Sequence, residues 1–316
     1  MSFKILGSGS CLPQRSITNA ELSKFLDTSD EWISQRVGID ARRVCTTETT
    51  TDLAAAAAKG ALEMSGVKIE ELDMIICATV SADNTVPSLA CSVQEALGAT
   101  CPAMDINAAC SGFIYLMETA AAFFALGYNR LLIIGAERLT RTVDWTDRST
   151  AVIFADGAGA MVLAPGESYV ASKLVAKGGD AVLSIPCYSG TSPFYEHEPK
   201  KPCVHMNGQE VFKFAVNAMC TDLADVIEKA GLTIDDIAWI IPHQANARII
   251  DAAVRKLKIA PERCLKNIEK VGNTSAASVA ILADELIRSG KLKDGDYIAM
   301  AAFGAGLTSA ACVLKW

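Results

Sequence analysis

The stretch CPAMDINAACSGFIYLMETAAAFFALG, residues 101–127, decides how the chain folds. It begins with a short apolar segment, turns at residues 107–109, presents Cys110 and continues into mostly apolar residues. This order predicts a buried strand, a tight turn and a buried helix with Cys110 in its first turn. Glu118 is the only charge between Cys110 and Gly127, so the helix is expected to have no wide solvent-exposed face.

A cysteine at the start of a helix has two interpretations. Unpaired backbone N–H groups and the positive end of the helix dipole favour the thiolate form, which would make Cys110 a nucleophile. An uncharged cysteine also packs well as a small apolar side chain. The stretch alone leaves both interpretations open.

Composition sets the broad class. A length of 316 residues with 51% hydrophobic residues favours about two domains. The sequence contains no apolar run long enough for a membrane span and no secretory start, so we expect a cytoplasmic protein that does not bind membranes. Eleven cysteines without a CxxC pair indicate reduced thiols, and a net charge of −7 without a basic run argues against nucleic acid.

An internal repeat predicts the domain organisation. Residues 61–77 align without gaps on residues 226–242, with identities at Glu63 and Glu228, Gly66 and Gly231, Ile69 and Ile234, Ile75 and Ile240, and Ile76 and Ile241. The same offset carries Cys110 to Ser275, and a helix of small residues follows each. We therefore predict two duplicated α/β halves, 1–168 and 169–316, with mainly parallel sheets covered by helices and one further layer where the halves meet.

Three other segments have alternative interpretations. In TSDEWISQRVGI, residues 28–39, a helix capped by Asp30 would place Trp32 and Arg36 on one face, either as a clamp for a planar base or as ordinary packing at the edge of the core. FADGAGAMVL, residues 154–163, fits a close-packed turn into a strand better than a phosphate-binding loop. Residues 178–208 suit a surface loop near a binding mouth, whose His197 and His205 lack the companions of a metal site.

Two polar residues stand at positions similar to that of Cys110. His243 follows the apolar strand of IIPHQAN, and Asn273 lies in EKVGNTSAAS, just before another helix of small residues. A cap and a turn would explain each one separately. Together with Cys110, they predict one site near the junction of the halves.

The motifs DEWISQRVGI, INAACSGF, PHQAN, VGNTSAAS and FGAGLTSA resemble those of the β-ketoacyl-acyl-carrier-protein synthase III family of the thiolase fold, in the family's order and along the whole chain. The resemblance implies a five-layered α-β-α-β-α core and an initiating condensing enzyme of type II fatty-acid synthesis. It implies a homodimer without metal or redox cofactor, which uses an acyl-CoA primer and malonyl-acyl-carrier protein.

The resemblance also implies roles for residues. Cys110 would accept the acyl group, with His243 and Asn273 completing the catalytic triad and the backbone N–H groups of Cys110 and Ala305 forming the oxyanion hole. The residues implied to bind coenzyme A are Thr28, Trp32, Arg36, Arg148, Gly208, Phe212 and Asn246.

The chemistry suits these residue types. A cysteine can carry an acyl group from one thioester to another. Decarboxylation of a malonyl thioester leaves an enolate, which needs hydrogen-bond donors and no base.

The chain departs from the family at two positions and offers one basic helix. Ala305 replaces a glycine that many members have, and Val86 replaces an aromatic residue that gates the acyl pocket from the partner subunit, which predicts a roomier pocket for primers longer than acetyl. Along the predicted helix at 245–258, a basic stripe would dock the acidic carrier protein or would simply be a solvated face; its members are Arg248, Arg255, Lys256 and Lys258.

Three other functions stay open at this stage. The order and spacing of Cys110, His243 and Asn273 also fit a papain-like hydrolase, although the duplication and the SGF sequence after the cysteine argue against it. The second is a condensing or acyl-transfer enzyme of secondary metabolism that uses coenzyme A thioesters. The third is a protein that only binds coenzyme A.

Overall fold

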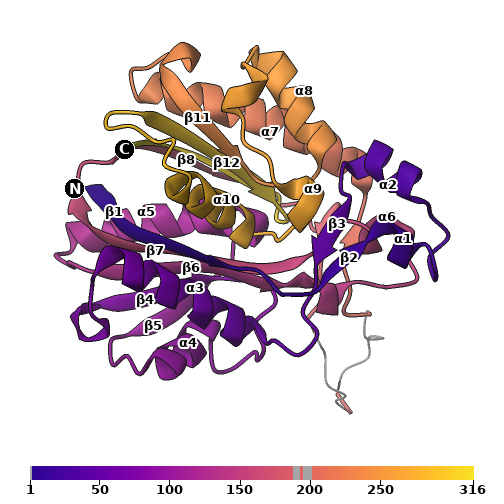
Figure 1. Ribbon diagram of the computed structural model, residues 1–316, viewed down its shortest axis with the longest axis horizontal. Coiled ribbons are helices and arrows are strands. Elements are labelled where there is room, and N and C mark those ends of the chain that lie inside the picture. Colours follow the sequence, from indigo (N-terminus) through magenta and orange to yellow (C-terminus); the bar gives the residue numbers. More distant parts are fainter. Residues whose placement is uncertain (1, 188–192, 195–200) are drawn as a thin grey trace.

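The computed structural model describes residues 2–187, 193–194 and 201–316, and these residues form five layers (Figure 1). Helices α3 (Thr50–Ser65) and α4 (Leu89–Leu97) cover the outer face of one sheet. Helices α5 (Gly112–Ala125) and α10 (Ala277–Arg288) lie between the two sheets. The layered α-β-α-β-α core predicted by the resemblance is therefore confirmed.

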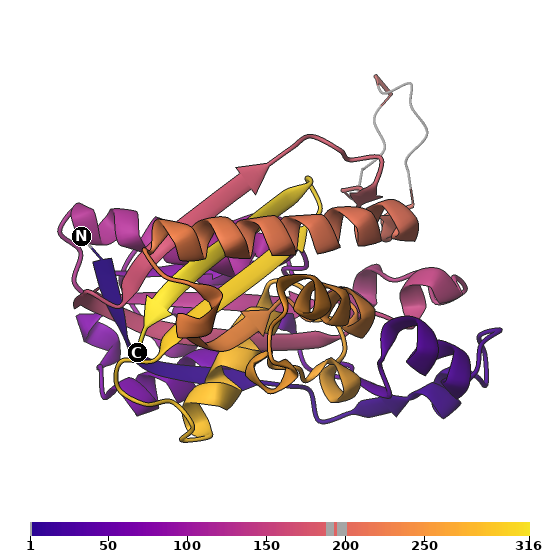
Figure 2. The ribbon, with the colours of Figure 1, turned by 90° about the horizontal axis from the view of Figure 1, so that it is seen from above.

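The outer face of the second sheet carries the last layer. Helix α7 (Gly208–Lys229) runs across its strands, as Figure 2 shows from above, and α8 (Ala247–Leu257) packs beside α7. No helix within the described part of the chain is both long and apolar enough to cross a membrane.

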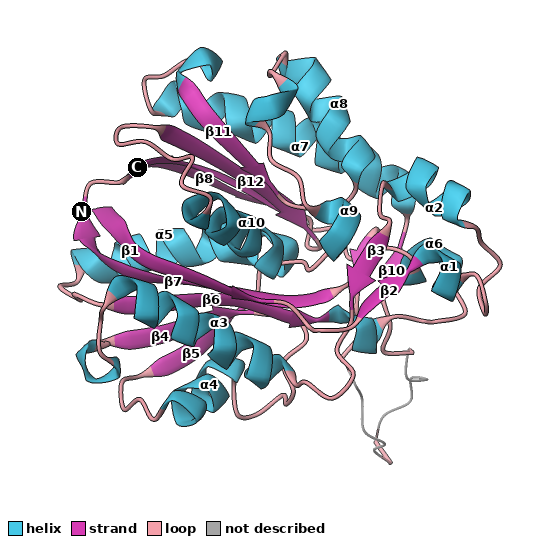
Figure 3. Cartoon of the chain, in the orientation of Figure 1, coloured by secondary structure: helices cyan, strands magenta, loops and turns pink. Residues whose placement is uncertain are grey.

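Both sheets are mixed, so the prediction of mainly parallel sheets is wrong. The first sheet has the order β1-β7-β6-β4-β5, with β1 at Ser2–Cys11, β4 at Met74–Ala78, β5 at Ala103–Ile106, β6 at Leu131–Arg138 and β7 at Asp156–Gly166. The second has the order β11-β12-β13-β8, with β8 at Tyr169–Ala176, β11 at Ile237–Pro242, β12 at Tyr297–Gly304 and β13 at Thr308–Lys315. The pairs β4–β5, β4–β6 and β11–β12 are parallel, whereas β6–β7 and β12–β13 are antiparallel. Only a short turn joins β12 to β13, but the connection from β6 to β7 contains the short helix α6 (Arg148–Ala151) (Figure 3).

Equivalent elements recur along the chain at the offset of the repeat. The single-turn 3-10 helices Ile69–Glu71 and Ile234–Asp236 follow helices α3 and α7, and each precedes a strand of the repeat. Gly66 and Gly231 both adopt left-handed φ angles, of 68° and 72°, where these helices end. Glycine tolerates this conformation, which explains why it appears in both copies.

Most of the remaining elements gather at one end of the layers, beside the site described below (Figure 3). They are β2 (Ser16–Thr18), α1 (Asn19–Leu22), α2 (Asp30–Val37), β3 (Ala41–Arg43), α6 (Arg148–Ala151), β9 (Leu183–Ser184), β10 (His205–Met206), α9 (Ile268–Val271) and the 3-10 helices Ala109–Ser111 and Leu139–Thr142. The 3-10 helix Pro261–Arg263 lies apart from them, beside the start of β11. Helix α2 is capped by Ser29, whose side chain accepts a hydrogen bond from the Trp32 N–H, rather than by Asp30 as predicted. Asp30 instead accepts a hydrogen bond from the Asn19 side chain.

The glycines of residues 154–163 are packing residues of β7 rather than a phosphate-binding loop. A Cβ on Gly157 would lie 3.0 Å from Ile281, and one on Gly159 would lie 2.5 Å from the Ala280 Cβ. Strand β7 therefore touches helix α10 backbone to backbone, and the predicted close-packed strand is confirmed.

We predict that Gly159→Ala lowers the free energy of unfolding by roughly 1–3 kcal/mol, because the added methyl group meets backbone atoms of α10 that cannot move aside. Denaturant unfolding followed by circular dichroism measures the change. Gly178→Ala is the control, since nothing lies within 4 Å of its added Cβ. Equal stability of the two variants would contradict the packing argument.

Candidate active site

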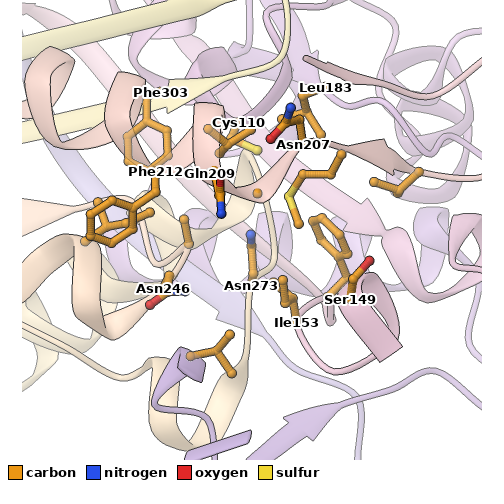
Figure 4. A pocket seen from close by; sticks show the side chains of 18 of the residues that line it. Cys110, Ser149, Ile153, Leu183, Asn207, Gln209, Phe212, Asn246, Asn273 and Phe303 are labelled. Carbon is orange, nitrogen blue, oxygen red and sulfur yellow. The ribbon is translucent and has the colours of Figure 1, made fainter. Parts of the chain in front are cut away.

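One cavity of about 1190 Å³ brings the three predicted catalytic side chains together. Cys110, His243 and Asn273 all line it, although they are far apart in the sequence. Figure 4 shows Cys110 and Asn273 in this lining. Apolar side chains, including Ile153, Leu183, Phe212 and Phe303, form much of its remaining wall.

Cys110 lies in a strained turn at the floor of this cavity. It belongs to the 3-10 helix Ala109–Ser111 that leads into α5, and Ala109 has a φ of 48°, which is uncommon for a residue other than glycine. A Cβ on Gly304 would lie 2.6 Å from the Cys110 nitrogen, so the end of β12 presses directly against this turn. The turn is thus clamped between the first half of the chain and the second.

The environment of Cys110 disfavours the thiolate, contrary to the prediction from its place at a helix start. Burial raises the pKa of the Cys110 thiol to about 12; the Ser275 hydroxyl opposes this rise and the nearby Glu137 carboxylate adds to it. Loss of hydration outweighs the helix dipole here. A buried thiolate loses more hydration free energy than a few backbone N–H groups restore by stabilising its charge. The resting group is therefore a thiol.

His243 is buried and neutral. Its backbone N–H donates to the Ala301 carbonyl at the end of the parallel strand pair, at 2.7 Å, and its ring lies edge-on to Phe303. Burial lowers the pKa of His243 to about 3. Its Nδ1 atom lies 2.6 Å from the Ser278 hydroxyl on α10, which leaves Nε2 for the cavity.

Asn273 is fixed by its own backbone. Its N–H and carbonyl bond to Ile153 and Ala155, and its side-chain Oδ1 accepts a hydrogen bond from the Ser275 N–H at 2.9 Å. The amide nitrogen therefore remains to donate into the cavity, where Figure 4 shows it. Ser275 has a φ of 49°, so this turn is strained in the same way as the Cys110 turn.

The mouth of the cavity carries aromatic and cationic side chains. Trp32 lies between two guanidinium groups, with the Arg148 carbon 5.0 Å and the Arg36 carbon 5.8 Å from its ring centre. Arg36 lines the cavity, while Arg148 also donates to the Asp27 carbonyl at 2.6 Å. The predicted juxtaposition of Trp32 and Arg36 on one face of a short helix is therefore present.

Other predicted residues lie at or near the mouth. Gly208, Phe212 and Asn246 line the cavity, and the Asn246 side chain caps α8. Thr28 and Ala305 lie outside its lining, although Ala305 adjoins Gly304, which is part of it. Val86 is 84% exposed and does not reach the cavity of its own chain.

The basic side chains of α8 face solvent, as the amphipathic pattern predicts. Its apolar side is buried, whereas the four cations are exposed, namely Arg248, Arg255, Lys256 and Lys258. Arg248 also lines the cavity, with its guanidinium 5.7 Å from the Phe212 ring. Lys258 is the left-handed C-cap of the helix.

The sequence interpretation missed three polar residues behind the cavity. Ser278 lies within the quoted VGNTSAAS motif, but its contact with His243 depends on how α10 meets the end of β11. Ser275 and Glu137 are buried next to Cys110 and influence the pKa of its thiol. Of the histidines in residues 178–208, His205 lines the cavity and His197 lies outside the described residues.

Among the residues that the structure describes, no group of three or more His, Cys, Asp or Glu side chains could hold a metal ion. The five layers, and a cavity at one end of them on which a cysteine, a histidine and an asparagine converge, place the protein among the thiolase-fold condensing enzymes.

Comparison with known proteins narrows this class. Residues 104–178 match the model of 3-oxoacyl-[acyl-carrier-protein] synthase III, and residues 227–316 match the model of its C-terminal part. A relative from Caldanaerobacter subterraneus subsp. tengcongensis, named beta-ketoacyl-[acyl-carrier-protein] synthase III, is 49% identical over 99% of this chain and 97% of its own.

Solved structures agree with the sequence matches. The 3-oxoacyl-[acyl-carrier-protein] synthase III from Aquifex aeolicus is 44% identical, covers all of both chains and superimposes with a TM-score of 0.93. The priming β-ketosynthase from the R1128 polyketide pathway is 35% identical over 99% of this chain and 96% of its own, with a TM-score of 0.92. The chain belongs to the β-ketoacyl-acyl-carrier-protein synthase III family, and it is an acyltransferase. This membership excludes the papain-like alternative.

We predict that alkylation of Cys110 by iodoacetamide accelerates about tenfold per pH unit without a plateau below about pH 10, because only the thiolate reacts and burial raises the thiol pKa. Peptide mass spectrometry of quenched time courses measures modification at this position. The Cys110→Ala variant identifies the background from the other cysteines. A plateau near neutral pH would show that the thiolate is already the resting form.

Proposed function

We propose that this chain catalyses the first condensation of type II fatty-acid synthesis, joining an acyl-CoA primer to malonyl-acyl-carrier protein. The observation that carries the proposal is the convergence of Cys110, His243 and Asn273 on one cavity in a chain of this family. The products are a 3-ketoacyl-acyl-carrier protein, coenzyme A and carbon dioxide.

In the first half-reaction, the Cys110 sulfur attacks the carbonyl carbon of the acyl-CoA thioester. The oxygen of the tetrahedral intermediate becomes negative and needs preorganised donors. The backbone N–H groups of Cys110 and Ala305 fill this role in the proposal, supported by the close approach of Gly304 to the Cys110 nitrogen. Expulsion of the coenzyme A thiolate leaves the acyl group on Cys110.

In the second half-reaction, malonyl-acyl-carrier protein loses carbon dioxide and its thioester oxygen becomes an enolate. His243 Nε2 and the Asn273 amide donate to that oxygen, and the enolate carbon then attacks the acyl group on Cys110. Loss of one such donor typically costs about 10²–10³ in rate. Neither group acts as a base in this step, which suits a histidine whose pKa burial lowers to about 3.

Ser278 sets the tautomer that this role requires. Its hydroxyl oxygen lies 3.4 Å from the Gln244 N–H, which can only donate, and 2.6 Å from His243 Nδ1. In the proposal the hydroxyl accepts from the amide and gives its own hydrogen to Nδ1. The ring proton of His243 is then on Nε2, facing the substrate.

Coenzyme A enters at the mouth of the cavity. Trp32, flanked by Arg36 and Arg148, suits a flat, electron-rich base, and the cations suit phosphates. Phe212, Gly208 and Asn246 would contact the arm that reaches toward Cys110, while Thr28 would contribute from beyond the cavity lining.

The proposal also covers the oligomeric state of the protein and its location in the cell. The protein works in the cytoplasm as a homodimer, without metal or redox cofactor, and each chain consists of the duplicated halves 1–168 and 169–316. The exposed side chain of Val86 projects into the acyl pocket of the partner subunit. Because valine is smaller than an aromatic residue, that pocket accepts primers longer than acetyl.

We predict that intact-protein mass spectrometry detects one acyl group on Cys110 after incubation with acetyl-, isobutyryl- or octanoyl-CoA, and that malonyl-acyl-carrier protein removes it. Cys110→Ala is the control and should acquire no acyl group. No adduct with any primer would refute the function, and a strong preference for acetyl would refute the roomier pocket. Discharge by malonyl-CoA alone, with no discharge by the carrier protein, would favour the secondary-metabolism alternative.

We predict that Arg248→Glu lowers the rate with malonyl-acyl-carrier protein more than it lowers acylation by acyl-CoA, because the exposed cations of α8 would dock an acidic carrier. The two half-reactions are measured separately. Lys59→Glu makes the same charge change on α3, in the opposite outer layer, and serves as the control. Equal losses in both half-reactions would contradict docking at α8.

A further inference from the structure

A buried carboxyl group lies behind the cavity and takes no part in the steps above. Glu137, near the end of β6, is completely buried. Its Oε2 atom accepts three hydrogen bonds from residues 79–81: from the Thr79 hydroxyl at 3.3 Å, the Val80 N–H at 3.1 Å and the Ser81 hydroxyl at 2.5 Å. Its other oxygen, Oε1, has no hydrogen-bond partner in the described chain.

The Ser275 hydroxyl lies near both this carboxyl group and the nucleophile. Its neighbour Ala276 packs against Gly135, two residues before Glu137 on β6, and against Gly112, two residues after Cys110. The Ser275 hydroxyl is buried and forms no hydrogen bond of standard geometry within the described residues. It nevertheless lies close enough to both Cys110 and Glu137 to lower the pKa of each. A hydroxyl can accept a proton from one neighbour while it donates its own to another.

Unsatisfied polar atoms in a protein interior are costly, so two of them beside a nucleophile call for an explanation. Strain in the backbone adds to the cost, because Ser275 has a φ of 49°. The bonds to Oε2 hold the carboxyl group in place and leave Oε1 for Ser275. The hydroxyl is therefore the group through which the thiol and the carboxylate could exchange a proton.

Acylation needs a proton acceptor, and neither His243 nor Asn273 supplies one. The thiol must lose its proton, since burial raises the pKa of Cys110 to about 12. His243 is a poor acceptor, because burial lowers its pKa to about 3 and Ser278 occupies Nδ1. Burial raises the pKa of Glu137 to about 7, near the pH at which a general base works best.

We propose that Glu137 stores the Cys110 proton, receiving it through the Ser275 hydroxyl when the cysteine is acylated and returning it when the product leaves. The inference rests on the proposed function. Glu137 touches no substrate and acts only through Ser275. As sulfur attacks the thioester carbonyl, the thiol proton moves to the Ser275 oxygen and the hydroxyl proton moves to Glu137 Oε1. The departing coenzyme A thiolate takes its proton from water.

The condensation then reverses the transfer. Attack of the enolate carbon expels Cys110 as a thiolate, which regains its proton from the Glu137 carboxyl group through Ser275. One full cycle takes up one proton from water, and this proton ends on the coenzyme A thiol. The uptake balances the negative charge that the malonyl carboxylate carried before it left as carbon dioxide. Protonated Glu137 also stops repelling negative charge on the sulfur, so the proton's arrival at Glu137 favours formation of the thiolate.

Few other charges act on this relay. Cys110 is the titratable group that faces Glu137 from the nucleophile turn, and residues 79–81 and Ser275 present only hydroxyl and amide groups. The adjacent Arg138 turns away to the Glu48 carbonyl and Asp83. Acylation should therefore rise with pH through the pKa of Glu137, because the stored proton needs an ionised carboxylate.

The test compares single-turnover acylation by an acyl-CoA in wild type, Glu137→Gln and Ser275→Ala, using intact-protein mass spectrometry at several pH values. We expect both variants to acylate about 10² times more slowly and to lose the rise near pH 7. Ser275→Ala leaves the bonds to Oε2 intact, so it tests the relay even where Glu137→Gln folds poorly. Asp284→Asn, which alters a buried carboxyl group on α10 away from the cavity, should acylate like wild type.

Two outcomes would overturn the relay. If Glu137 only repels the thiolate, Glu137→Gln will acylate faster than wild type. The relay also requires a transient uptake of up to one proton per acyl group during wild-type acylation in weakly buffered solution slightly above neutral pH, which Glu137→Gln lacks. No proton uptake by wild type would contradict the relay. Failure of wild type itself to acylate would instead refute the proposed function.

Discussion

The structure depends on three glycines at which helices and strands come into close contact. A Cβ on Gly112 would lie 2.8 Å from the Ala78 Cβ, one on Gly135 would lie 2.7 Å from the Ala276 carbonyl, and one on Gly159 would collide with α10. These glycines let α5 and α10 approach each other and the first sheet. Because the two helices begin side by side, the turns that precede them meet at the floor of one cavity.

Burial shifts the pKa of each of these ionisable groups in the direction that favours its neutral form. It raises the pKa of the Cys110 thiol, lowers that of His243 and raises that of Glu137. As a result, Cys110 and His243 carry no charge at rest, and only the Glu137 carboxyl group behind them titrates near neutrality. Such a site suits chemistry in which negative charge appears only transiently on oxygen or sulfur and must be stabilised by fixed donors.

Local pattern predicted the elements and the three converging side chains. Strand ends, turn residues and the repeat placed Cys110, His243 and Asn273 correctly, because these signals lie within short segments. Strand direction could not be predicted in the same way, because antiparallel β6 and β7 are also joined through a helical segment and the apolar pattern carries no information on direction. The thiol pKa and the roles of Glu137 and Ser278 depend on contacts across the two halves; a glutamate near the end of an apolar strand gives no sign that it is buried.

The paired strained turns bear on how such a site could arise. Ala109 and Ser275 share nearly the same left-handed φ in the turns that precede the two central helices. In a dimer of identical half-length ancestors, both turns would have carried the same side chains about a two-fold axis. Fusion of two such copies would free each turn to change separately, so one side could acquire a nucleophile and the other an amide donor by single substitutions within an inherited backbone.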